Sequence, residues 1–159
     1  MAIDKIKQAK SIYNDIKSYF NSTKLNYTPD DQKLVIKSGF NTNDFPVEFI
    51  MTVDTDRELV FLYSKMTFIV PEDKRVDMAI AICAANSHLA NGCFDYDIST
   101  GTIIFRMVNS FANGSKLDAT VYDYIVSVSV STVDKYNDKF FMLSKNMITL
   151  EKFLDECNN

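Results

Sequence analysis

Apolar residues recur every three or four positions near the start of the chain. Between residues 2 and 21 this spacing predicts an amphipathic helix, because it places the apolar side chains on one face. That face consists of Ile3, Ile6, Ala9, Tyr13, Ile16 and Phe20. A polar cluster around Pro29, over residues 26–31, then predicts a break in regular structure.

The pattern changes after residue 33 to one typical of strands. Runs rich in β-branched and aromatic residues predict strands over 34–40, 47–53 and 59–69. The short polar connection 54–57 predicts that the second and third strands form an antiparallel hairpin. A further hairpin is predicted from the runs 94–98 and 102–108, joined by a turn at Gly101.

The segment 71–91 has the start and stop signals of a helix. Pro71 suits the first turn, and Asn91 with Gly92 supplies a left-handed stop. His88 lies near the predicted carboxyl end, where the helix dipole favours a polar or cationic side chain.

The same helix carries two apolar stripes, although a helix that lies on one sheet needs only one. The first stripe contains Val76, Ile80, Cys83 and Ser87. The second contains Met78, Ile82, Ala85 and Leu89, for which we favour a homodimer or partner interface. The alternative is burial of that stripe under other helices of the chain.

The segment from residue 118 to 147 gives two conflicting signals. Residues 126–131 alternate between valine and serine like a strand, yet an apolar stripe of helical period runs for about seven turns. A strand that long would far exceed the usual length. We therefore predict one long helix, with a break allowed near residues 137–138. Ser115 and Asp118 fit a capping box at its start, and a short helix is predicted over 149–156.

These elements predict a single domain over residues 1–159 of the α+β class. Its order is helix, three strands, helix, two strands, helix, arranged as a two-layer structure with an antiparallel sheet. The length of 159 residues suits one domain.

Charge and composition exclude several classes of function. A formal net charge of −4 and a pI near 4.9 argue against a general nucleic-acid binder, which needs a basic face. No apolar run reaches the ~20 residues of a membrane span, and the charged start is unlike a secretory signal. Three cysteines, odd in number and far apart, predict reduced thiols and a cytoplasmic protein.

Candidate catalytic side chains are few. The chain has one histidine, His88, and on a helix the side chain of Cys83 would diverge from it by roughly 140°. The direction of Cys93 relative to His88 cannot be derived from spacing. A single histidine and three cysteines argue against a His/Cys zinc site, and no cofactor is predicted, since no phosphate, dinucleotide or hydrolase motif occurs.

Two aspartate pairs, Asp54 with Asp56 and Asp95 with Asp97, could perform acid–base chemistry or bind a cation. Neither pair has the further oxygen ligands or the glycine of a calcium loop. Solvated carboxylates are the interpretation we favour. A small enzyme using Cys93 or an aspartate pair remains an alternative function.

One stretch of the chain resembles a known family. Asn86-x-x-Leu89-x-x-Gly92-x-Phe94-x-x-Asp97, followed by Gly101-x-Ile103-x-Phe105-Arg106, resembles the bacterial YbjN family, as does the segment Val133-Asp134-Lys135-Tyr136. The motif positions are Asn86, Gly92, Phe94, Asp97, Gly101, Phe105, Arg106 and Tyr136.

The resemblance implies the fold of type III secretion chaperones and supports a helix over residues 118–147. It also implies a non-enzymatic protein-interaction module, a homodimeric bacterial regulator of the YbjN type. A secretion chaperone that binds a segment of an effector protein is the alternative within the same class.

Overall fold

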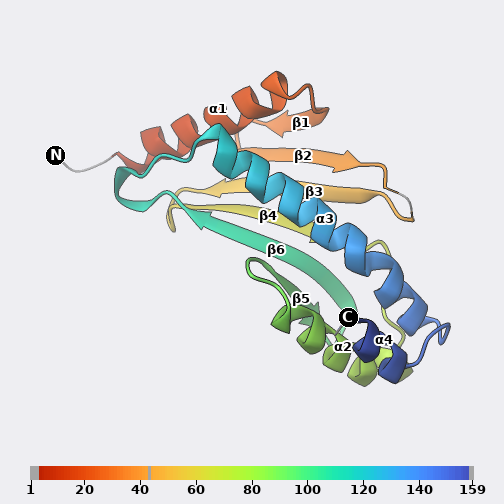
Figure 1. Cartoon of the computed structure of the whole chain (residues 1–159). Coiled ribbons are helices and arrows are strands. Elements are labelled where there is room, and N and C mark those ends of the chain that lie inside the picture. Colours follow the sequence, from red (N-terminus) through yellow and green to blue (C-terminus); the bar gives the residue numbers. More distant parts are fainter. Residues whose placement is uncertain (1–3, 43, 158–159) are drawn as a thin grey trace.

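In a computed structural model of the protein, residues 4–42 and 44–157 are described. Helices α1 and α3 lie across one face of the sheet, and α2 and α4 gather at its β5 end (Figure 1). The elements are α1 (Lys5–Ser22), β1 (Tyr27–Asp30), β2 (Val35–Phe40), β3 (Val47–Asp54), β4 (Leu59–Lys65), η1 (Glu72–Lys74), α2 (Arg75–Ser87), β5 (Cys93–Asp97), β6 (Thr102–Ser110), η2 (Ala112–Gly114), α3 (Ala119–Ser144) and α4 (Leu150–Cys157).

Over the described residues, the strands form one antiparallel sheet in the order β1-β2-β3-β4-β6-β5. Alternate side chains of each strand enter the core beneath α1 and α3, because successive residues of a strand point to opposite faces. Buried examples are Phe49 and Met51 on β3, Leu62 on β4 and Phe105 on β6. This confirms the predicted α+β class with an antiparallel sheet.

Helix α1 begins where Asp4 caps it. One carboxylate oxygen of Asp4 accepts hydrogen bonds from the backbone N–H groups of Ile6 and Lys7, which satisfies donors that have no partner within the helix. The face that enters the core contains Ala9, Ile12, Tyr13, Ile16, Tyr19 and Phe20. The predicted start at residue 2 lies outside the described residues.

The sheet has one more strand before α2 than the sequence predicts. Residues 26–31 were expected to break regular structure, but β1 forms there and pairs with β2, with Pro29 opposite Ile36. Proline is tolerated at this position because β1 is an edge strand, so the missing N–H is not needed by a second neighbour. Strand β4 ends at Lys65 rather than at residue 69.

Helix α2 is shorter than predicted. Residues 72–74 form a 3-10 turn after Pro71, and the α-helix runs from Arg75 to Ser87. It ends before the expected stop, with His88 in the capping position. Gly92 still has the left-handed backbone, with a φ of 79°, but it shapes the turn into β5.

The long helix is confirmed. Helix α3 runs unbroken from Ala119 to Ser144 over 26 residues. Its N-cap is Asp118, whose carboxylate accepts the N–H of Val121 at 3.0 Å. Ser115 does not cap α3, because its hydroxyl donates to the Ala112 carbonyl at 2.8 Å.

The stripe of α2 that we predicted to be an interface is buried, and the other stripe is exposed. Met78 and Ala85 are fully buried and Ile82 is 4% exposed, while Leu89 packs partly buried against the same core. Helix α2 lies against α4, β5 and α3 of its own chain, and the buried Phe153 anchors α4. The stripe that we assigned to a partner is therefore part of the protein's own core.

Candidate protein-interaction surfaces

Asn86 ties the end of α2 to strand β5. Its side-chain nitrogen donates to the Phe94 carbonyl at 3.0 Å, and its side-chain oxygen accepts the Phe94 N–H at 2.8 Å. Because β5 is the last strand of the sheet, these bonds occupy peptide groups that an added strand could otherwise use. This motif residue fixes the fold and protects the sheet edge.

Three other motif residues are aromatic and form the core next to Asn86. The ring centroid of Phe94 lies 5.1 Å from that of Phe105, 5.5 Å from that of Tyr136 and 5.1 Å from that of Phe140. Phe105 is fully buried and Tyr136 is 1% exposed. Edge-to-face pairs of this kind add to the energy of burial, so these motif positions are structural.

The remaining glycine and aspartate of the motif shape the β5–β6 turn. Gly101 has a φ of 75°, and a Cβ atom there would collide with the Val70 carbonyl. Asp97 accepts hydrogen bonds from the hydroxyl and N–H of Ser99 and from the N–H of Thr100. These bonds hold the pKa of Asp97 below its ordinary value.

The candidate thiol lies in an ion-paired cluster. The Arg106 guanidinium bonds to Asp95 at 2.6 Å and to the Cys93 sulfur at 3.3 Å. The hydrogen bond from Arg106 holds the pKa of Asp95 below its ordinary value, whereas burial raises the pKa of Cys93. A raised pKa keeps the thiol protonated and weakly nucleophilic. His88 is exposed beyond the end of α2, and no hydrogen bond among the described residues links it to Cys93.

In the other aspartate pair, the side chain of Asp54 is also engaged. Asp54 pairs with Arg57 at 2.7 Å and accepts its backbone N–H. Among the described residues, no cluster of three or more His, Cys, Asp or Glu side chains is arranged to hold a metal ion.

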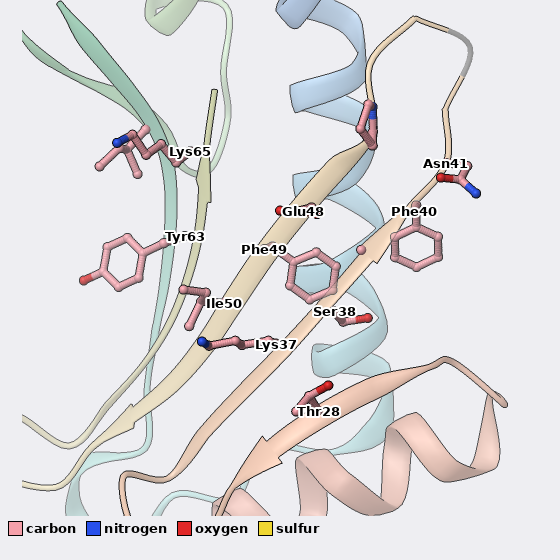
Figure 2. Close-up of a pocket in the computed structure, with 13 residues that line it drawn as sticks. Thr28, Lys37, Ser38, Phe40, Asn41, Glu48, Phe49, Ile50, Tyr63 and Lys65 are labelled. Carbon is pink, nitrogen blue, oxygen red and sulfur yellow. The ribbon is translucent and has the colours of Figure 1, made fainter. Parts of the chain in front are cut away.

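The face of the sheet opposite α1 and α3 is open. Figure 2 shows part of it, with Lys37, Ile50 and Tyr63 on neighbouring strands. A shallow pocket of about 890 Å³ lies here, and its charged lining residues are Lys37, Lys65 and Glu48. Paired residues across the sheet give the row Thr28, Lys37, Ile50, Tyr63, Arg106 and Cys93. In this row Ile50 and Tyr63 lie between two cationic side chains, Lys37 and Arg106.

A second uncovered surface is the outer stripe of α2. Val76 is 66% exposed, Ile80 is 46% exposed and Cys83 is also exposed. Ile98 in the β5–β6 turn is also exposed. This turn lies beside the start of α2, because Arg75 donates to the Ser99 carbonyl of the turn at 2.6 Å. Val76, Ile80 and Cys83 therefore lie exposed along one face of α2 at the β5 end.

A third surface is the seam between α1 and α3, at the other end of α3. The Tyr19 hydroxyl donates to Asp123 at 3.0 Å, and its ring centroid lies 6.2 Å from that of Tyr122. Burial, together with the bond to Asp123, raises the pKa of Tyr19 to about 12. The sequence analysis identified none of these three residues as part of a site.

Comparisons with known proteins support the fold and no sequence family. No protein-family model matches the chain, and no curated protein sequence matches it significantly. Among solved structures, the ExsC–ExsE complex aligns with a TM-score of 0.59 at 11% identity, covering 82% of this chain and 93% of that chain. The HopA1–SchA chaperone–effector complex aligns with a TM-score of 0.56 at 10% identity, covering 86% of this chain and 99% of that chain.

YbjN from E. coli is also similar in structure. It aligns with a TM-score of 0.54 at 9% identity, covering 77% of this chain and 85% of that chain. At these identities the likeness shows a shared α+β fold, which confirms the predicted architecture. Over the described part of the chain, no helix has both the length and the apolar character to cross a bilayer.

Proposed function

We propose that this protein is a non-enzymatic protein-interaction module that acts as a homodimer in the bacterial cytoplasm. Support comes from the fold, which is shared with YbjN and with proteins solved in a chaperone–effector complex. The candidate catalytic groups also favour binding over chemistry, since Cys93 is held protonated by burial and Asp95 is bound by Arg106.

The observation that carries the dimer proposal is the outer stripe of α2. Val76, Ile80 and Cys83 are exposed on a helix whose opposite face is already buried in the core. Contiguous apolar surface is uncommon on monomers, and a two-fold axis beside α2 would cover the stripe with its own copy. Asn86 blocks the edge of β5, so we assign the contact to the helix face.

Light scattering of the purified protein tests this proposal. We expect a dimer at tens of micromolar, and Ile80→Asp should convert it to a folded monomer because it places an unpaired charge in the interface. The matched control is Ile6→Asp, at an isoleucine that is 60% exposed on α1, which should remain dimeric. A monomeric parent protein, or equal effects of the two variants, would contradict the proposal.

A secretion-type chaperone is the second candidate within the same class. It is favoured by the structural likeness to the HopA1–SchA chaperone–effector complex and by the open sheet face with its pocket of about 890 Å³. Such a chaperone would co-purify with a disordered segment of one effector protein. A regulator would instead co-purify with a folded partner, so limited proteolysis of the captured partner distinguishes the two.

A further inference from the structure

The seam between α1 and α3 contains two adjoining pockets. The first, of about 390 Å³, is lined by Asp15, Asp118 and Tyr122 among others. The second, of about 470 Å³, has an apolar floor that includes Leu25, Phe40 and Val130. Tyr19 lines both pockets, so the two form one continuous surface, which we name the α1–α3 seam.

Every charged side chain that lines the α1–α3 seam is acidic. They are Asp15 and Asp118 in the first pocket and Asp123 and Asp134 in the second, and no described lysine or arginine lines either pocket. None of the four forms an ion pair with a described residue. Negative potential therefore accumulates along this seam, whereas the pocket of the open sheet face mixes lysines with Glu48.

Two buried polar atoms in the α1–α3 seam lack partners. Tyr122 is 1% exposed, and its hydroxyl makes no hydrogen bond to any described residue. One oxygen of Asp134 is likewise buried and unbonded. Buried polar groups are almost always hydrogen-bonded, so both atoms need a hydrogen-bond partner that no described residue supplies. Both the phenol oxygen and the carboxylates accept hydrogen bonds from cationic nitrogen atoms.

We propose that the α1–α3 seam binds a basic, amphipathic segment of a partner protein. Its apolar side chains pack on Leu25, Phe40 and Val130, and its arginine or lysine side chains bind the aspartates and the Tyr122 hydroxyl. An arginine fits best, because a guanidinium has five donors in one plane and can bridge several acceptors. The inference rests on the proposed protein-binding function and specifies the chemistry of the partner.

Binding of labelled synthetic peptides, measured by fluorescence anisotropy, tests the inference. Asp118 and Asp134 are separated by about 24 Å along α3, so a helical peptide of about sixteen residues spans the seam. The probe has arginines on one face and leucines on the other. A second peptide has glutamate in place of arginine, and a third has serine in place of leucine. Salt at about 0.15 M suppresses long-range attraction.

Two protein variants with the same net charge make the test specific. The seam variant combines Asp15→Asn, Asp123→Asn and Asp134→Asn. It leaves the N-cap Asp118 intact, and each asparagine retains an oxygen acceptor. The control variant combines Glu72→Gln, Asp73→Asn and Glu151→Gln, which are exposed carboxylates away from the seam. We expect the seam variant to weaken binding of the arginine–leucine peptide about tenfold, equal to 1.4 kcal/mol, and the control variant to change it less than about twofold.

The outcomes separate this inference from the proposed function. Equal losses in both variants would show non-specific attraction and overturn the inference. Equally tight binding of the glutamate or serine peptide would also overturn it. The dimer is measured separately, through Ile80 at the β5 end, so a failed seam with an intact dimer leaves the proposed function standing. A monomeric parent protein that binds the basic peptide only through the seam would give the opposite outcome. The dimer proposal would then fail, and the inference about the seam would stand.

Discussion

The two ends of α3 differ in the packing around their aromatic side chains, although each end has a buried polar atom without a described partner, the Tyr122 hydroxyl near the amino end and the Asn137 amide nitrogen near the carboxyl end. Near its carboxyl end, Tyr136 packs against Phe94, and the Asn86 amide bonds to the Phe94 peptide with both of its polar atoms. Near its amino end, the Tyr122 hydroxyl is buried without a partner. Helix α3 is therefore anchored to the β5 end and leaves unused acceptors in the α1–α3 seam.

This difference separates the residues that maintain the fold from those that could bind a partner. The motif that resembles the YbjN family maps to the anchored end, where most of its side chains fill the core or hold turns and Arg106 pairs with Asp95. A short motif of this kind predicts architecture, because packing and turns need particular residues. It says less about the partner, because Asp134 is the one seam aspartate that lies in a stretch resembling the family, and Asp15, Asp118 and Asp123 lie outside it.

The largest effect should come from the anchored end. Phe94→Ala removes a ring that is 3% exposed and contacts three other rings, so it should lower the free energy of unfolding by about 3–5 kcal/mol. The matched control is Phe40→Ala in the seam, where the ring is only partly buried and its loss should cost less. Chemical denaturation of both variants measures the difference, and equal losses would contradict the comparison.

Asn86→Ala should have the next largest effect. It leaves the Phe94 N–H and carbonyl without their side-chain partner, which should cost about 1–3 kcal/mol. It also exposes the edge of β5, so the variant should aggregate more readily. Ser87→Ala, at the exposed neighbour whose hydroxyl bonds only within α2, is the control. If the two variants have the same denaturation midpoint, Asn86 does not anchor the strand.

Periodicity predicted most of the fold. The apolar stripe over seven turns identified α3 correctly despite its valine–serine alternation, because a buried helix face must repeat every 3.6 residues. It also showed that α2 has two stripes. It could not show which stripe enters the core, because that depends on where β5 and α4 lie in space.

Two other features were beyond local signals. Strand β1 forms around Pro29 because it is an edge strand, and edge position is a property of the whole sheet. The α1–α3 seam brings Tyr19 beside Tyr122, two residues far apart in sequence. One signal was available: Asp123 and Asp134 are eleven residues apart, which is about three helical turns, so both lie on one flank of the predicted helix.

A smaller effect should come from the start of α3. Asp118→Ala removes the carboxylate that accepts the Val121 N–H and should cost about 0.5–2 kcal/mol. Ser115→Ala removes a hydroxyl that bonds only to the Ala112 carbonyl in an exposed turn and should cost less. Thermal melts of both variants measure the order. A larger loss in Ser115→Ala would mean that the cap lies at Ser115, as the sequence predicted.

The smallest effect on stability should come from Tyr122→Phe. This change removes a buried hydroxyl that has no hydrogen-bond partner among the described residues and keeps the ring that packs beside Tyr19. Such a hydroxyl is desolvated without compensation, so the free energy of unfolding should stay within about 0.5 kcal/mol or rise. Tyr19→Phe is the matched control. It breaks the bond to Asp123 and should cost about 0.5–1.5 kcal/mol.

Tyr122→Phe should leave the free energy of unfolding unchanged or higher in denaturation experiments and weaken peptide binding. If the hydroxyl serves a partner, the variant keeps its stability yet binds the arginine–leucine peptide more weakly than the parent protein. If the hydroxyl instead stabilises the fold, its removal would lower the free energy of unfolding and leave peptide binding unchanged. That second pattern would place an unseen internal partner at Tyr122, and the difference between the two ends of α3 would then be one of packing density alone.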